Sequence, residues 1–206
     1  MFRRPRIHPE RWLENRAHAL RLVHAVRRVA NTLHVALIDL DFCGVWLSGS
    51  ATSMSLILEK LAALGLVLPA VPTPVAAYVN CVRSGNLLFL SGGLPIDGDV
   101  KVIGKVPGDV SIEQAKEGAR MIVLNRLAVI QDAIGSLDKV RQIVSLTGFV
   151  NSAADFYGHP QVINGASELL VEIFGDKGRH SRTALGAAAL PLNVAVEINL
   201  IVEIED

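Results

Sequence analysis

The last segment of the chain, residues 194–205, has the clearest pattern of hydrophobic and polar positions. Every second residue from Val194 to Ile204 is apolar, and the positions between them mix apolar, amide and carboxylate side chains. Successive side chains of a strand point to opposite faces, so this alternation predicts a strand with one wholly apolar face. We expect that face to pack against helices, and the mixed face to meet solvent, another subunit or a pocket.

Three further segments, residues 55–64, 112–134 and 162–174, carry apolar residues at the spacing of a helix. The second segment starts with a capping-box sequence, in which Ser111 is followed three residues later by Gln114. A glycine comes directly after each segment, and glycine is the usual residue just beyond the end of a helix. We therefore expect one short helix and two long ones.

Short apolar runs bounded by turn residues predict the remaining strands. We expect strands at 78–82, 87–91, 140–150 and 182–189, and a loop or a hairpin over the glycine-rich residues 92–108. Strands and long helices then alternate along the second half of the chain. This order predicts an α+β fold, with a mixed β-sheet and two long helices packed on one of its faces.

Composition divides the chain into three parts. Residues 1–53 carry eight arginines against four acidic residues, and we interpret them as a basic N-terminal extension. Three interpretations of this extension stay open: an amphipathic helix over residues 9–33, a transit peptide, or an upstream segment before a translation start at Met54. Residues 54–73 hold the short helix and a proline-rich linker, and the main domain follows at 74–206.

The same counts argue against several kinds of partner. The whole chain has 20 basic and 20 acidic residues, and residues 54–206 are net acidic, whereas a nucleic-acid site needs a basic patch. The charge-free stretch 61–82 is broken by Gly65 and three prolines, so we expect no membrane helix. Two cysteines, Cys43 and Cys81, make neither a disulfide framework nor a metal site. We expect a cytoplasmic protein without a metal.

Two charged residues stand where a site could form. Glu197 lies on the mixed face of the last strand, and Arg182 starts the strand that we expect beside it. An arginine binds a carboxylate through two parallel hydrogen bonds, and a glutamate can orient or deprotonate a water molecule. The pair suits a small anionic substrate attacked by water, although an ordinary exposed surface would also carry such residues. His159 and His180 are expected on loops, and His180 in solvent.

Three motifs resemble those of the YjgF/RidA family, in the family's order and at nearly its spacing, over about residues 74–205. They also resemble one branch of it, with a Gly-Arg-His-x-Arg segment and an Asn-Gly-Ala-Ser helix start. The matching residues are Gly85–Gly92 with Leu94-Pro95, Ile143–Val150, Ser181–Ala184 with Leu190-Pro191 and Val196–Ile198, and for the branch Gly178–Arg182 and Asn164–Ser167.

The resemblance implies a chorismate-mutase-like α+β fold and a homotrimer with clefts between subunits. Members of the family hydrolyse reactive enamines and imines derived from amino acids to 2-keto acids and ammonia, and they need no cofactor. By position, the resemblance implies that Arg182 grips the substrate carboxylate and that Glu197 handles the attacking water. The substrate-binding residues that it implies are Arg182, Tyr78, Ser91, Gly92, Asn164, Thr183 and Ala184.

Some positions depart from the family pattern. Ala184 stands where many deaminases carry cysteine, and Gly93 where they often carry glutamine. Tyr78 follows Ala-Ala in place of Gly-Pro, and residues 178–181 replace the usual Pro-Ala. These differences leave the substrate open. A non-catalytic trimer that senses small carboxylates remains an alternative, as do ribonuclease activity and chorismate mutase activity, for which Arg179 would be the one helper in the cleft.

Overall fold

The computed structural model describes residues 55–74 and 76–205. All interpretations of residues 1–53 therefore lie outside the described residues. Among the described residues, no helix has both the length and the apolar character that a membrane span requires.

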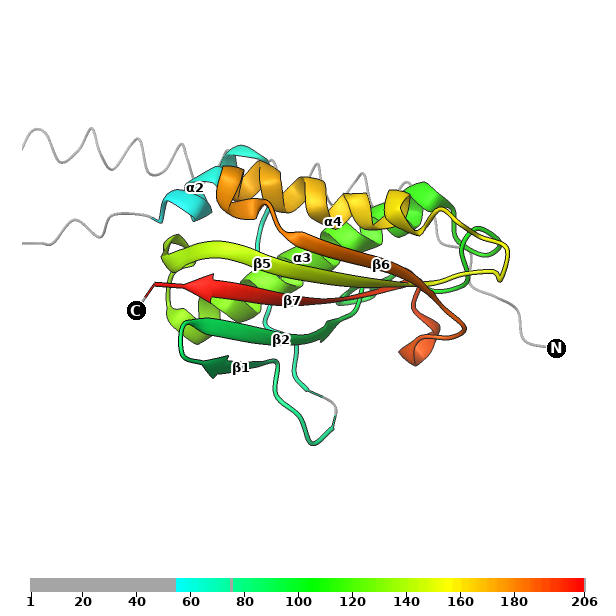
Figure 1. Cartoon of the computed structure of the whole chain (residues 1–206), viewed down its shortest axis with the longest axis horizontal. Helices are drawn as coiled ribbons and strands as arrows, with labels where there is room; N and C mark the ends of the chain where they lie inside the picture. Colours follow the sequence, from blue (N-terminus) through cyan, green and yellow to red (C-terminus); the bar gives the residue numbers. More distant parts are fainter. Residues whose placement is uncertain (1–54, 75, 206) are drawn as a thin grey trace, which may run out of the picture. The chain divides into compact units, whose positions relative to one another are not determined.

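The described chain folds as an α+β domain, which confirms the expected class (Figure 1). Its helices are α2 (Leu56–Ala63), α3 (Ile112–Ile134) and α4 (His159–Phe174), with short 3-10 turns η2 (Leu137–Lys139), η3 (Gly175–Gly178) and η4 (Pro191–Asn193). Its strands are β1 (Cys81–Ser84), β2 (Leu87–Gly93), β3 (Ile96–Asp97), β4 (Val100–Lys101), β5 (Val140–Asn151), β6 (Ser181–Ala187) and β7 (Val196–Ile204).

Five strands form one mixed sheet in the order β1-β2-β7-β5-β6, and β3 and β4 pair separately. The β3–β4 pair is the hairpin expected within residues 92–108. All neighbours in the large sheet are antiparallel except β5 and β6, which are parallel. A parallel pair needs a crossover connection, and α4 supplies it. In the order of the five strands, β7 is the central strand and β6 is an edge strand.

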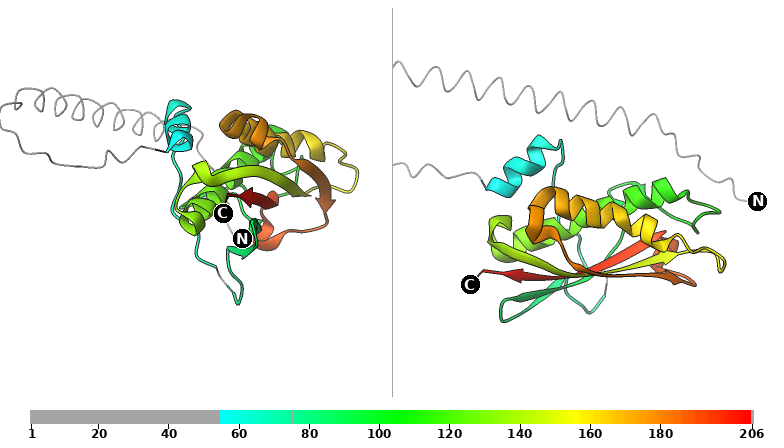
Figure 2. Two further views of the ribbon diagram at one scale, coloured as in Figure 1. Left: turned by 60° about the vertical axis from the view of Figure 1, so that its left-hand side comes forward. Right: turned by 45° about the horizontal axis from the view of Figure 1, so that its top comes forward.

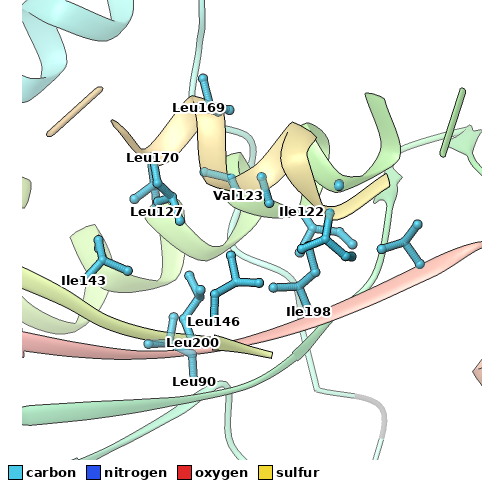
Figure 3. Close-up of a cluster of buried hydrophobic side chains, with 14 of the residues drawn as sticks. Leu90, Ile122, Val123, Leu127, Ile143, Leu146, Leu169, Leu170, Ile198 and Leu200 are labelled. Carbon is cyan, nitrogen blue, oxygen red and sulfur yellow. The ribbon is translucent and has the colours of Figure 1, made fainter. Parts of the chain in front are cut away.

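Both long helices cover the same face of the sheet (Figure 2). The alternate apolar residues of β7, from Val196 to Ile204, are buried under them, as the sequence predicts. Their neighbours in the core come from β2, β5, α3 and α4, and Figure 3 shows Leu146, Ile122 and Leu170 among them. The other face of the sheet has no described element packed on it.

Some boundaries differ from the sequence expectation. β1 begins at Cys81 rather than at residue 78, because its ladder with β2 ends at the pair of Cys81 with Leu90. His159 is the first residue of α4 and not a loop residue. The main correction concerns β6, which we expected beside β7: the parallel β5–β6 pair puts β5 between them.

One carboxylate from the main domain caps the start of the short helix α2, whose Leu61 packs in the core. Asp138, in η2, accepts hydrogen bonds from the Ser55 hydroxyl at 3.0 Å, the Leu56 N–H at 3.0 Å and the Ile57 N–H at 2.9 Å. Burial acts to raise the pKa of Asp138, but these three bonds, with help from Lys177, bring it below its ordinary value. The first N–H groups of a helix lack partners within the helix, so Asp138 satisfies donors that α2 cannot.

We expect Asp138→Ala to lower the free energy of unfolding by about 1 kcal/mol, the usual effect of losing a helix cap. The folded-state pKa of Asp138 is lowered, so its contribution is present above about pH 4 and is lost as the pH falls through that pKa. Urea unfolding at pH 7 and pH 3 measures both effects. Asp132→Ala, at an exposed position of α3, is the control. Equal stabilities of the two variants at pH 7 would contradict the assignment.

Candidate functional site

Glu197 lies on the open face of the sheet, in the central strand β7. Phe149 of β5 is its cross-strand neighbour, and its carboxylate lies directly over Gly92 of β2. A Cβ atom at residue 92 would overlap the Glu197 carboxylate, so the glycine makes room for that group. The structure therefore brings Glu197 and Gly92 together within one chain.

The Glu197 carboxylate is partly buried and lacks a charge partner. Burial raises its pKa above the ordinary value. No lysine, arginine or histidine of the described residues forms an ion pair with it. A carboxylate that is desolvated without a cation is costly to keep charged, and it accepts a proton more readily than an exposed one. Such a group suits proton transfer or the orientation of a water molecule.

Ser91 is held against the segment that precedes β1. Its hydroxyl donates to the Val79 carbonyl at 2.6 Å, and its N–H donates to the Asn80 carbonyl at 2.9 Å. Tyr78 belongs to the same segment, and its side chain is 49% exposed. The hydroxyl proton of Ser91 is thus used within the protein, while its oxygen keeps lone pairs that a ligand could use.

A buried arginine, Arg126 of α3, lies behind this part of β2 and was not predicted from the sequence. Its side chain is 3% exposed, burial lowers its pKa, and its Nη1 donates to the Ser91 carbonyl at 3.1 Å. That carbonyl and the Gly92 N–H belong to one peptide unit, so the bond polarises the Gly92 N–H. One signal in the sequence could have found it: a charged residue within the apolar stripe of α3.

Arg126 also gives a reason for one departure from the family pattern. A Cβ atom at Gly93 would lie 2.7 Å from the Ile122 side chain and 2.9 Å from Nε of Arg126. The space that a side chain at residue 93 would occupy is therefore taken by α3. This position differs from the family as a consequence of packing beneath β2.

Arg182 lies on the edge strand β6, paired with Leu146 of β5, and its side chain reaches α4. Its Nη1 donates to Oδ1 of Asn164 at 2.7 Å and to the Ser167 hydroxyl at 3.3 Å. Both acceptors are neutral, and no carboxylate of the described residues pairs with this guanidinium. The bonds to α4 use Nη1 alone, so the Nε–H and Nη2 edge is left for a ligand. That edge is a fork that matches a carboxylate.

His180 is part of the same cluster: it lies on a loop, as expected, but it is partly buried and not solvated. It lies between η3 and β6, is partly buried, and uses both ring nitrogens. Nδ1 meets the Gly178 carbonyl at 2.7 Å, and Nε2 meets the Ser167 hydroxyl at 3.0 Å. The nearby Arg179 forms an exposed ion pair with Asp176 at 3.1 Å and is not part of this cluster.

The two residues after Arg182 point to opposite sides of β6. Thr183 pairs with Thr147 of β5 and shares the open face with it. Ala184 lies on the helix side, like Arg182, and packs against the core. Ala184 is thus close to the arginine but offers a ligand no polar atom.

Within one chain, Arg182 and Glu197 do not form a pair. They lie on opposite faces of the sheet, with β5 between their strands. Two strand spacings and three residues along β5 separate their Cα atoms by about 14 Å. The structure therefore contains two half-sites. We call them the glutamate half-site (Glu197 and Gly92) and the arginine half-site (Arg182, Asn164, Ser167 and His180).

Neither half-site contains a metal-binding set. The described residues hold no group of three or more His, Cys, Asp or Glu side chains placed to bind a metal ion. The thiol of Cys81 is partly buried, and burial raises its pKa against the lowering effect of Arg126. A thiol of this kind is a poor nucleophile at neutral pH.

Comparisons with known proteins agree with this fold. The model of the family described as "YjgF/chorismate mutase-like, putative endoribonuclease" matches residues 58–204. Protein TCP17 of Trypanosoma cruzi is 37% identical over 160 residues, which are 76% of this chain and 99% of that protein. The crystal structure of the protein Atu1372 from Agrobacterium tumefaciens is 42% identical with a TM-score of 0.67, and the match covers 73% of this chain and 92% of that one.

One further relative has an enzyme name. The 2-iminobutanoate/2-iminopropanoate deaminase of Dermatophagoides farinae is 29% identical over 137 residues, which are 66% of this chain and 93% of that protein. The family match spans most of the chain, and the relatives are covered almost completely. The chain therefore belongs to the YjgF/RidA family and has its chorismate mutase-like fold.

Proposed function

We propose that the protein hydrolyses reactive imines and enamines derived from amino acids to 2-keto acids and ammonia. The observation that carries this proposal is the arginine half-site, where neutral acceptors hold Arg182 and leave its charge uncompensated. A fixed, uncompensated guanidinium is a binding site for a small carboxylate. The named deaminase among the relatives supports the same reaction class.

In the proposed reaction, Arg182 binds the substrate carboxylate through its free Nε–Nη2 edge. An enamine first gains a proton at carbon and becomes the imine, whose protonated nitrogen makes the neighbouring carbon electrophilic. Water attacks that carbon while Glu197 accepts one of its protons. That proton then passes to the nitrogen, the C–N bond breaks while the freed Glu197 carboxylate takes the remaining hydroxyl proton, and the products are ammonia and a 2-keto acid. Holding carboxylate and water in place supplies much of the acceleration, and no cofactor is required.

The reaction needs both half-sites, so we propose that the active site forms between two copies of the chain. A substrate of a few atoms cannot reach Arg182 and Glu197 of one chain across about 14 Å and through the sheet. If one copy offers its β6 edge to the open face of the next, the missing half is supplied. Such a contact joins two different surfaces, and it closes into a ring when the rotation between copies allows; we propose a trimer.

The open face has the character of a protein interface. Strand register places several apolar side chains on it, and three of them are strongly exposed: Phe89 at 43%, Leu185 at 50% and Val82 at 55%. Exposed apolar side chains gathered on one face of a sheet are typical of a site of association. This exposed apolar surface supports the proposed association of copies in a trimer. The cytoplasmic location expected from the sequence stays a prediction.

We expect the purified protein to accelerate ammonia release from imines that an amino-acid oxidase generates from several amino acids, above the spontaneous rate. Arg182→Ala should raise KM roughly 10- to 100-fold, because a charge-assisted pair is lost. Glu197→Gln should lower kcat by about 10²- to 10⁴-fold, the usual range for a general base. If no imine reacts faster than background while small carboxylates still bind at Arg182, the protein is a carboxylate-binding trimer and not a deaminase.

Co-expression of the two inactive variants tests the shared site. In every mixed trimer, whichever variant is present twice, one cleft joins Arg182 from one copy to Glu197 from the next, so about a third of the clefts are intact. We therefore expect activity to return to about that fraction of wild type, measured with trimers separated by tags on both variants. Co-expression of each variant with itself is the control. No recovery in confirmed mixed trimers would mean that one chain holds the whole site.

The raised pKa of Glu197 makes two further results measurable. If Glu197 is the base, activity falls as the pH is lowered, with a midpoint above the ordinary value of 4.5. Its folded-state pKa exceeds the unfolded one, so the charged carboxylate costs stability once the pH has risen through that pKa.

We therefore expect Glu197→Gln to unfold at the same or a higher temperature than wild type at pH 7, with no gain at pH 4. Thermal unfolding measures this. Glu203→Gln is the matched control: it lies on the same strand and the same face but pairs with Arg141 at 3.4 Å, so it should gain no stability. A Glu197→Gln variant that loses stability at pH 7 would contradict the uncompensated carboxylate.

A further inference from the structure

His180, Ser167 and Arg182 are joined in a series of hydrogen bonds that starts at the Gly178 carbonyl. A carbonyl can only accept, so the contact of His180 Nδ1 with the Gly178 carbonyl requires the proton on Nδ1. In the neutral ring Nε2 then carries no proton and accepts a hydrogen bond from the Ser167 hydroxyl. The Ser167 oxygen therefore turns its lone pairs toward Arg182, whose Nη1 donates to it.

The Gly178 carbonyl, where this series of hydrogen bonds starts, is held in place by packing. A Cβ atom at Gly178 would overlap the backbone of Leu170 and Val171, so only glycine lets η3 approach α4 this closely. At the other end, Asn164 and Ser167 lie one turn apart on α4 and share one face of the helix. Arg182 is thus gripped on one nitrogen by two acceptors from a rigid helix, while its fork edge is left over.

We propose that Ser167 and His180 are positioning residues that orient Arg182 for the carboxylate of the ligand. The proposal rests on the proposed function insofar as Arg182 is taken as the carboxylate-binding residue. Neither Ser167 nor His180 need touch the substrate: His180 orients the serine hydroxyl, and the serine oxygen orients the guanidinium. Neutral acceptors do this without cancelling the positive charge, whereas a carboxylate in their place would compete with the ligand.

The same domain contains a second Ser–His pair, which lacks the contact with Arg182. Ser152 contacts Nε2 of His159 at 3.0 Å, the same distance as in the Ser167–His180 pair. It packs against Gly186 of β6 and has no contact with Arg182. The two pairs match in chemistry and in their contact with β6, so Ser152→Ala is a control for the loss of a serine hydroxyl beside a histidine.

The test measures the Kd of pyruvate, the kind of 2-keto acid that the reaction would release, by calorimetry on the assembled protein, together with imine kinetics. Ser167→Ala and His180→Ala should each raise the Kd and KM about five- to tenfold, as expected for one lost hydrogen bond, with kcat within about twofold. Ser167→Thr, which keeps the hydroxyl, should restore most of the affinity. Ser152→Ala should bind as wild type does.

Double variants separate a relay from two independent defects. If His180 acts through Ser167, the Ser167→Ala/His180→Ala variant is no weaker than either single variant, and neither change weakens binding further in an Arg182→Ala background. Additive losses in these backgrounds would overturn the inference. The inference would also be overturned if Ser167→Ala and His180→Ala bound pyruvate as tightly as wild type while Arg182→Ala no longer bound it. That result would leave the proposed function intact. Unchanged affinity of Arg182→Ala would instead refute the carboxylate site itself.

Discussion

The structure depends on the central strand β7, in which one face is entirely apolar and the other is not. Burial of its alternate residues from Val196 to Ile204 beneath α3 and α4 joins both long helices to the sheet. The same alternation fixes which side chains remain outside. Slipping the strand by one residue would turn Glu197 into the core, where a charge without a partner is strongly unfavourable. The alternating pattern of β7 therefore determines both which of its residues enter the core and where Glu197 lies.

Glu197 and Arg182 have no counter-charge among the described residues. Glu197 is partly buried over Gly92, and Arg182 is held by the amide of Asn164 and the hydroxyl of Ser167. A protein selected for stability alone would pair such groups or replace them. Uncompensated charges that are held in place are typical of sites that await an ionic ligand. Because they lie on opposite faces of one sheet, one small ligand can contact both kinds of group only where two copies of the chain meet.

Much of the fold and part of the site could be predicted from local patterns. The capping box at Ser111 and the alternation of residues 194–205 predict α3 and β7 within two residues. The family motifs point to Glu197, Gly92, Arg182 and Asn164, and the structure brings the first two together and the last two together. The sequence expectation was wrong about β6 beside β7 and about a solvated His180, and it missed Arg126, because each depends on contacts between distant segments.

The sequence by itself determined the α+β class, the two-faced central strand and the residue types available for chemistry. Hydrophobic periodicity and capping act over a few residues, so they can be read locally. Only the tertiary structure decided that β5 separates Arg182 from Glu197, that His180 and Ser167 meet across 13 positions of the chain, and that Arg126 lies behind Ser91. Strand order and side-chain contacts follow from how the whole core packs, and no single segment contains that information.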